Sequence, residues 1–276
     1  MELARANTWQ ARLEVIKAGI ERVHPRASVV VVTYNNLAYT RLCVESVLRN
    51  TLHPNVELIV VDNGSGDGTA EYLRGLAGER AGVRAIVNVE NRGFGAAVNQ
   101  GLGLASGEYL VVLNNDTVLP NGWLSRLVRH LEDPRVGLVV SVTNFSGNES
   151  RIEAEYGDLE GLEEFAARYG LEHEGEAFDI RVAAMYCVAM RREAYERVGP
   201  IDERFEVGLF EDDDYSHRMR LAGYRVVCAE DAYVHHFGQA SFKQLSAAEY
   251  QAIWDRNRRL YEEKWAMTWQ PYQLRS

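Results

Sequence analysis

The sequence predicts an α/β fold in which a mainly parallel, Rossmann-like sheet is flanked by helices. Apolar, β-branched runs such as residues 29–32 lack the alternation of half-exposed strands, which is typical of strands buried on both faces. Segments with helical spacing of apolar residues separate these runs, and each run ends in a polar or Gly-rich loop. This alternation favours a parallel sheet with helices on both faces.

Residues 1–27 are predicted to form an amphipathic helix that precedes the sheet and is closed by Pro25. The apolar residues at helical spacing are Trp9, Leu13, Ile16, Ile20 and Val23. Charges between them do not fit a secretory signal, and no run of the chain approaches the roughly 20 apolar residues of a membrane span. We therefore expect a soluble, cytoplasmic protein.

Residues 28–117 are expected to form the first half of the sheet. One predicted strand begins at residue 28, and further strands lie at 57–61, 83–88 and 108–113, with helices at about 38–50, 69–77 and up to 105 between them.

The pattern becomes less regular after an apolar run at 136–142. Residues 143–180 are acidic and polar, with a helical stretch at about 159–169, and we interpret them as an insertion or lid near the ligand cleft. The later predicted elements are a strand at 182–190, helices at 192–198 and 212–222, a strand at 224–228, and a last helix at 246–265.

Charge and cysteine content exclude several classes. Forty acidic and thirty basic residues give a formal net charge of −10, which argues against nucleic-acid binding because phosphate contacts need clustered Lys and Arg. Cys43, Cys187 and Cys228 lie far apart without a CxxC pair, so we expect reduced thiols and neither a zinc site nor a disulfide framework.

Polar residues gather where the predicted strands end. Ligands of open α/β sheets bind outside the carboxyl ends of the strands, so one cleft is expected to collect Thr33, Asp62, Asn91 and Asp116. Asp62 either caps its own loop or accepts a hydrogen bond from a nucleobase. Gly93 either serves a turn or lets backbone N–H groups approach a diphosphate.

A divalent cation is expected in this cleft. Asn114, Asn115 and Asp116 bring oxygen ligands to the end of an apolar strand, and such ligands suit Mg²⁺ or Mn²⁺ completed by diphosphate oxygens. Asp116 is the predicted metal ligand. His235 and His236 are either structural or contact the metal or a phosphate.

Four consecutive carboxylates, Glu211 to Asp214, precede a predicted helix. Some of them suit a helix N-terminus, where negative charge is favoured. That role does not explain why four anions are clustered, whereas a carboxylate poised to take a proton from a hydroxyl nucleophile does. A Rossmann dinucleotide fingerprint is absent, because residues 33–36 contain no glycine, and a dehydrogenase is therefore disfavoured.

With these residues in place, the chain resembles the family 2 glycosyltransferases of the GT-A fold, particularly bacterial enzymes of cell-surface polysaccharide and rhamnan-type assembly, including rhamnosyltransferases. The matching segments, in family order, are Val29 to Asn36, Val61 to Thr69, Asn91 to Asn99, Leu113 to Thr117, Phe210 to Asp214 and His235 to Phe242. Six ordered motifs are far more specific than any one of them.

The resemblance implies a GT-A catalytic domain at 28–242, with a nucleotide-binding half at 28–117, an acceptor and catalytic half at 181–242, and a C-terminal helical extension at 243–276. Nucleotide-sugar binding is implied for Thr33, Tyr34, Asn35, Asp62, Asn91, Arg92, Gly93, Asn114 and Asn115. The catalytic pair would be Glu211 and Asp212, with Asp212 as general base. Metal contact is implied for Asp116 and for one of the two histidines, with His235 favoured by its spacing from the preceding strand.

The implied reaction is an inverting transfer from a UDP-, dTDP- or GDP-sugar to a carbohydrate or lipid-linked hydroxyl acceptor in bacterial polysaccharide or glycoconjugate synthesis. A lipid-linked acceptor would bring peripheral membrane association. Acceptor binding is expected from the insertion 143–180 and from the C-terminal aromatic residues, whose alternative role is helix packing. These aromatic residues are Tyr250, Trp254, Tyr261, Trp265 and Trp269.

One position departs from the family's DxD motif. Asn114 replaces the first carboxylate, so Asp116 is the motif's remaining charged ligand and weak metal affinity is expected.

Two alternative functions remain open for this sequence. A sugar-nucleotide nucleotidyltransferase should carry a Gly-rich, basic loop after the first strand, which this chain lacks. A non-catalytic nucleotide-sugar or carbohydrate-binding module would bind the ligand without turnover.

Overall fold

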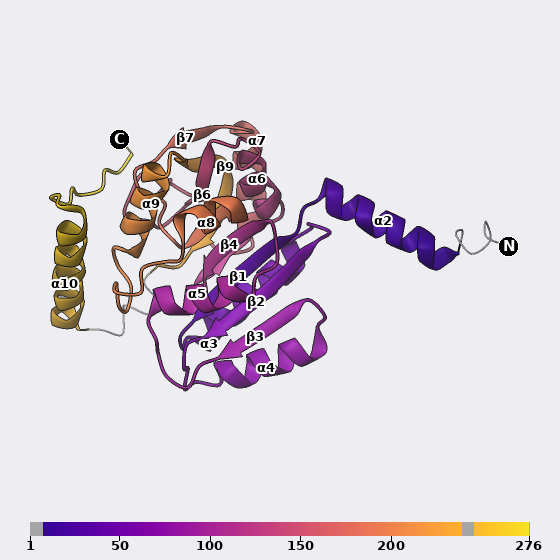
Figure 1. The fold of residues 1–276 in the computed structure, drawn as a ribbon, viewed down its shortest axis with the longest axis horizontal. Coiled ribbons are helices and arrows are strands. Elements are labelled where there is room, and N and C mark those ends of the chain that lie inside the picture. The colour runs from indigo at the N-terminus through magenta and orange to yellow at the C-terminus, as the bar shows by residue number, and fades with distance from the viewer. Residues whose placement is uncertain (1–7, 239–245, 276) are drawn as a thin grey trace.

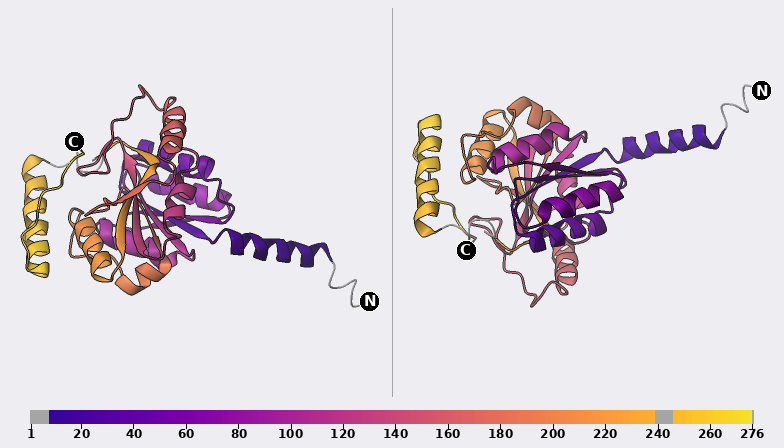
Figure 2. Two further views of the ribbon diagram at one scale, coloured as in Figure 1. Left: turned by 90° about the horizontal axis from the view of Figure 1, so that it is seen from above. Right: turned by 90° about the horizontal axis from the view of Figure 1, so that it is seen from below.

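The computed structural model describes residues 8–238 and 246–275 of the chain. Within them, nine strands form one sheet in the order β3-β2-β1-β4-β8-β6-β9-β5, with β7 beside β9. Helices lie on both faces of this sheet, while α2 and α10 lie at opposite ends of the molecule (Figures 1 and 2). The predicted α/β class is confirmed.

The first half of the sheet is parallel, as predicted. β1 (Ala27–Thr33) lies between β2 (Val56–Asp62) and β4 (Tyr109–Asn114), and β3 (Val83–Val87) pairs with β2. The connecting helices are α3 (Leu37–Asn50), α4 (Thr69–Glu79) and α5 (Phe94–Leu104). The register pairs Thr33 with Asp62 at the strand ends, so the loops after β1 and β2 begin side by side.

Beyond β4 the sheet is mixed. β8 (Cys187–Arg191) runs antiparallel to both β4 and β6 (Val136–Thr143), and β6 is parallel to β9 (Arg225–His236). The short strands β5 (Thr117–Val118) and β7 (Ala177–Asp179) pair antiparallel with β9. The helices of this half are α6 (Trp123–His130), α7 (Leu162–Glu172), α8 (Arg192–Val198) and α9 (Glu211–Leu221).

Two strand predictions in this half differ from the structure. β8 begins at Cys187 and not at 182, because residues 182–186 take an irregular path along the ligand cleft. β9 does not stop at 228 but continues to His236, because β6 pairs with it as far as Val234 and β5 pairs with its last two residues. The sequence analysis did not predict the helix α6. This helix begins directly after Gly122, whose own backbone has a left-handed conformation.

The predicted insertion at 143–180 has two structural roles. Its helix α7 packs against β9 and buries Leu162, Phe165 and Ala166 in the core. The segment 145–148 instead lines the ligand cleft.

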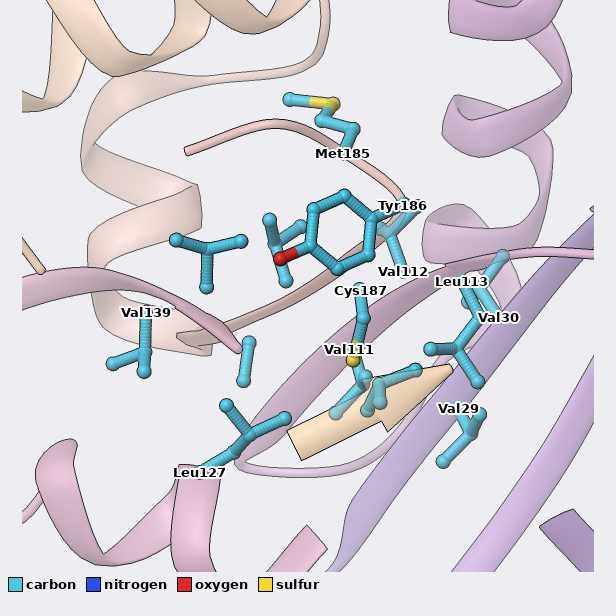
Figure 3. Packing of buried hydrophobic residues seen from close by; sticks show 14 of the residues in the cluster. Val29, Val30, Val111, Val112, Leu113, Leu127, Val139, Met185, Tyr186 and Cys187 are labelled. Atoms are coloured by element: carbon cyan, nitrogen blue, oxygen red, sulfur yellow. The ribbon is translucent and has the colours of Figure 1, made fainter. Parts of the chain in front are cut away.

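The apolar core fixes the ends of the strands. β1 is buried along its whole length, and Figure 3 shows Val29 and Val30 near the β4 side chains Val111 and Val112. These residues are register partners across the two strands. Burying each such side chain contributes about 1.5–3 kcal/mol. The loops that follow β1 and β4 therefore start from a rigid platform.

The terminal helices differ in how they contact this body. α2 (Trp9–Val23) projects away from it and leaves Trp9 and Ile16 exposed (Figure 1). α10 (Ala247–Trp265) begins with a capping box at Ser246 and packs on the opposite side. Its apolar interface consists of Phe205, Leu209, Phe210, Trp254, Leu260, Tyr261, Trp265 and Trp269.

Candidate active site

A cleft of about 770 Å³ opens at the carboxyl ends of β1, β2 and β4, where the sequence predicted a ligand site. Loops from both halves of the chain line it. The predicted site residues among its lining are Tyr34, Asn91, Asn114, Asn115, Asp116, Glu211, Asp212 and His236. Residues separated by up to two hundred positions in the chain therefore meet here.

Thr33 and Asp62 lie beneath the cleft and are fully buried. The Thr33 hydroxyl lies 2.7 Å from that of Thr40, and the Asn115 amide donates to Thr33 Oγ1 at 3.2 Å. Asp62 accepts a hydrogen bond from the Ser65 backbone N–H at 3.3 Å, and burial raises its pKa. In this structure both residues therefore organise the loops around them.

Asn35 joins the first two loops. Its backbone N–H donates to Ser65 Oγ at 2.7 Å, and its side-chain oxygen accepts from the Gly66 N–H at 2.9 Å. Asn35 and Asn36 both have positive φ, of 53° and 60°, a conformation that asparagine tolerates better than most residues. These contacts shape the wall next to Tyr34.

Asn63 is a cleft residue that the sequence analysis did not single out. Its amide donates to Asn91 Oδ1 at 2.8 Å and to the Gly93 carbonyl at 3.1 Å, and its oxygen accepts from the Arg92 N–H at 3.1 Å. It thereby holds the loop after β3 against the loop after β2. The sequence signal for Asn63 was its position directly after Asp62, at the polar end of a predicted strand. Arg92 itself is exposed.

Asp116 and His236 face each other across the base of the cleft, with Asp116 Oδ1 3.2 Å from His236 Nε2. His236 Nδ1 lies 2.9 Å from the Phe145 carbonyl oxygen, so we assign the ring proton to Nδ1. Nε2 then presents its lone pair toward a carboxylate oxygen. Two facing acceptors fit a shared cation, and a carboxylate and an imidazole are both ligands that divalent metals accept.

The other histidine has a different environment. His235 Nδ1 lies 2.6 Å from the Tyr156 hydroxyl, and burial lowers the His235 pKa to about 4. Because β9 continues through both positions, successive side chains point to opposite faces, and His236 is the one beside Asp116. The preference for His235 assumed that the strand ended at 228, and the geometry favours His236 instead.

The protein side chains supply few ligands for a metal. Among the described residues, no group of three or more His, Cys, Asp and Glu side chains could hold one. A cation held by Asp116 and His236 would therefore complete its shell with diphosphate oxygens and water, as Mg²⁺ commonly does. Asn114 lines the same part of the cleft and offers an amide oxygen.

The four carboxylates at the start of α9 divide into two pairs. Asp213 accepts hydrogen bonds from Trp269 Nε1, at 3.0 Å, and from the Tyr272 hydroxyl. Asp214 accepts from Trp265 Nε1 at 2.9 Å and forms an ion pair with Lys264. This pair anchors the C-terminal segment, which explains two of the four charges.

Glu211 and Asp212 face the cleft instead. Burial, followed by repulsion from Asp213, raises the pKa of Glu211 to about 7. Burial, followed by repulsion from Glu211 and Asp213, raises the pKa of Asp212 well above its ordinary value. A carboxylate with a raised pKa is a stronger base, so this pair is suited to accepting a proton.

A family model described as glycosyl transferase family 2 matches residues 28–199. The chain belongs to this family. The match ends before Glu211, so the predicted catalytic pair, His236 and the C-terminal helix lie beyond the matched segment.

Named relatives are similar over most of the chain. An O-antigen biosynthesis protein of Myxococcus xanthus is 28% identical over 77% of this chain, and an uncharacterised Sinorhizobium fredii protein is 29% identical over 87%. The chain spans only 17% and 28% of their respective lengths. A Haloferax volcanii glycosyltransferase is 27% identical over 83% of this chain and 74% of its own length.

Two solved glycosyltransferases share the fold. GalNAc-T7, described with UDP, GalNAc and Mn²⁺, superposes with a TM-score of 0.62 at 16% identity, over 77% of this chain and 44% of its own. A Pyrobaculum calidifontis mannosyltransferase described with GDP-Man and Mn²⁺ gives 0.58 at 24% identity, over 77% and 57%. The fold of this family 2 glycosyltransferase is therefore GT-A. None of its described helices is long and apolar enough to cross a membrane.

Proposed function

We propose that this family 2 glycosyltransferase moves a sugar from a nucleoside diphosphate sugar to a hydroxyl acceptor with inversion at the anomeric carbon. The observation that carries the proposal is the meeting of two pairs in one cleft. Glu211 and Asp212 supply a candidate base, and Asp116 and His236 supply a candidate metal position. The loops after β1, β2 and β3 line the same cleft and would bind the nucleotide.

The donor would lie along the loops that follow the parallel strands. Tyr34 and Asn91 line this side, and Asn63 keeps the loop after β3 in place. Gly93 has a φ of +82°, which favours glycine, and it precedes the N-terminus of α5, where backbone N–H groups would favour a diphosphate. A UDP-, dTDP- or GDP-sugar is the donor class that such a site serves.

The displacement would occur in one step. Asp212 accepts the proton of the acceptor hydroxyl while the acceptor oxygen bonds to the anomeric carbon. The bond between that carbon and the diphosphate oxygen breaks on the opposite face, and the nucleoside diphosphate leaves. Asp116 and His236 would hold Mg²⁺ or Mn²⁺, whose charge would stabilise the leaving diphosphate.

The acceptor would approach from the C-terminal side of the cleft. Tyr250 and Trp254 on α10, together with Tyr272 after it, line this side next to Asp212. Aromatic rings provide flat apolar surfaces with a polar edge, which suits a saccharide. A carbohydrate or lipid-linked acceptor of bacterial polysaccharide synthesis, used in the cytoplasm and bringing peripheral membrane association, is consistent with the name of the Myxococcus relative.

A thermal-shift panel tests the proposal. UDP-, GDP- and dTDP-sugars with Mn²⁺ should raise the melting temperature of the native protein, since a ligand that binds the folded state stabilises it. Release of the nucleoside diphosphate on addition of carbohydrate acceptors should follow for the sugar that binds. Binding without turnover across the acceptor panel would identify a non-catalytic module, and formation of a sugar nucleotide from a nucleoside triphosphate would identify a nucleotidyltransferase.

A further inference from the structure

The loop that leads into α9 has an unusual backbone. Four successive residues, 207–210, have positive φ angles of 71°, 134°, 75° and 72°. Three of them, Val207, Leu209 and Phe210, are not glycine, and a β-branched residue such as Val207 is rarely found in this region. Each such residue destabilises the loop unless surrounding contacts hold it. The contacts that hold this loop come from α10 and the residues that follow it.

A single side chain on α10 meets most of the loop carbonyls. Asn257 is fully buried, and its Nδ2 lies 2.8 Å from the Gly208 oxygen, 3.1 Å from the Leu209 oxygen and 3.3 Å from the Glu206 oxygen. An amide group has two N–H donors, so these three carbonyls share them. Carbonyls exposed by the irregular loop thus find their partner on another element.

Two further contacts attach the loop to α10. Arg256 donates to the Glu206 carboxylate at 2.9 Å and to its carbonyl at 3.1 Å. The Phe210 ring packs against Trp254, with ring centroids 5.0 Å apart, and against Trp269 at 5.5 Å. α10 lies beside α9 (Figure 1), and Lys264 on α10 forms an ion pair with Asp214 on α9. The loop is therefore held from one side along its length.

The same loop reaches both ends of the reaction site. Residues 207–210 line the cleft and run directly into Glu211 and Asp212. At the other end, a Cβ added to Gly93 would lie 3.3 Å from the Val207 nitrogen, so the loop closes against the proposed diphosphate position. Displacement of this loop would move the catalytic carboxylates relative to the donor.

We propose that Asn257 is a positioning residue: it clamps loop 206–210 in a strained conformation that sets Asp212 against the donor sugar. The catalytic arrangement therefore depends on α10, which lies outside the segment matched by the family model. This inference rests on the proposed glycosyl transfer for its catalytic meaning, but the clamp itself is a property of the folded protein.

Hydrogen exchange of the full chain tests the clamp without any substrate. Peptides that cover residues 210–216, where the Asp214 N–H donates to the Phe210 carbonyl oxygen at 3.0 Å, should exchange slowly in the wild type and at least about tenfold faster in Asn257→Ala. Gln251→Ala, an exposed change on the same helix, should leave these peptides unchanged. Rapid exchange of these peptides in the wild type would already overturn the clamp, even if the Asn257 variant did not fold.

Turnover and rescue distinguish positioning from simple stabilisation. With the nucleotide sugar that the wild type uses, Asn257→Ala should lower kcat at least about tenfold while the donor KM changes less. Adding Val207→Gly should restore much of kcat, because glycine adopts positive φ without strain, whereas the melting temperature should stay low. A purely structural role predicts no such rescue, so unrestored kcat would reject positioning. A wild type without turnover would refute the proposed function, and hydrogen exchange would still decide the clamp.

Discussion

Replacement of Glu211 by Gln should change how stability depends on pH. The pKa of Glu211 rises from 4.5 to about 7 on folding, first through burial and then through repulsion from Asp213. A carboxyl group whose pKa is higher in the folded state favours folding while it is protonated. Its contribution is therefore complete below about pH 4.5 and is lost as the pH rises through about 7.

The magnitude follows from the shift. At about 1.4 kcal/mol per pKa unit, a rise from 4.5 to about 7 corresponds to about 3 kcal/mol of unfolding free energy. Gln cannot ionise, so the variant should gain about this much relative to the wild type on going from acid to alkaline pH. Glu211 Oε2 has no hydrogen-bond partner among the described residues, so a buried Gln amide would cost about 1–3 kcal/mol at every pH. That offset leaves the pH dependence unchanged.

Urea unfolding at about pH 5, 6, 7 and 8 measures this difference directly. The free-energy difference between Glu211→Gln and the wild type should shift in favour of the variant mainly between pH 5 and about 7. Asp158→Asn, which replaces an exposed carboxylate, should follow the wild type. Parallel curves for Glu211→Gln and the wild type would mean that Glu211 ionises in the folded protein as easily as in the unfolded chain, contrary to the buried cluster.

Three more outcomes follow from the site. Asp212→Asn should reduce turnover about 10²–10⁴-fold while the donor-induced thermal shift persists, and near-normal turnover would eliminate Asp212 as the base. His236→Ala should abolish the extra stabilisation that Mn²⁺ adds to a bound nucleoside diphosphate, whereas His235→Ala should retain it; the reverse pattern would contradict the Asp116 geometry. Asn63→Ala should raise the donor KM by a larger factor than it lowers kcat, because the change releases the loop after β3.

The ligand cleft could be predicted because parallel strands reveal their ends in the sequence. Buried strands read as apolar runs, and the polar residues that follow them, such as Asn91 and Asp116, must lie at one sheet edge. The same reasoning could not separate His235 from His236. That choice depends on how far β9 continues, and the last two residues of β9 pair with β5, a two-residue strand too short to give a sequence pattern.

Side-chain networks were less predictable than strand ends. Asn63 resembles any loop asparagine, and its importance comes from meeting Asn91, Arg92 and Gly93, which are distant in the chain. Asn257 is similar, because it lies in a charged helix pattern and its role depends on carbonyls about fifty positions earlier. Polar residues that serve remote backbone groups carry no periodic signal of their own.

The acidic cluster shows why charge alone did not assign the base. Four adjacent carboxylates predict a positive partner, but only Asp214 forms an ion pair with a lysine, Lys264, among the described residues. Asp213 and Asp214 obtain hydrogen-bond donors from Trp269 and Trp265 in the C-terminal segment, while burial and then repulsion from neighbouring carboxylates raise the pKa values of Glu211 and Asp212. The C-terminal segment therefore does more than cover the sheet. By binding one pair of carboxylates it fixes the start of α9, and that fixed start directs the other pair into the cleft.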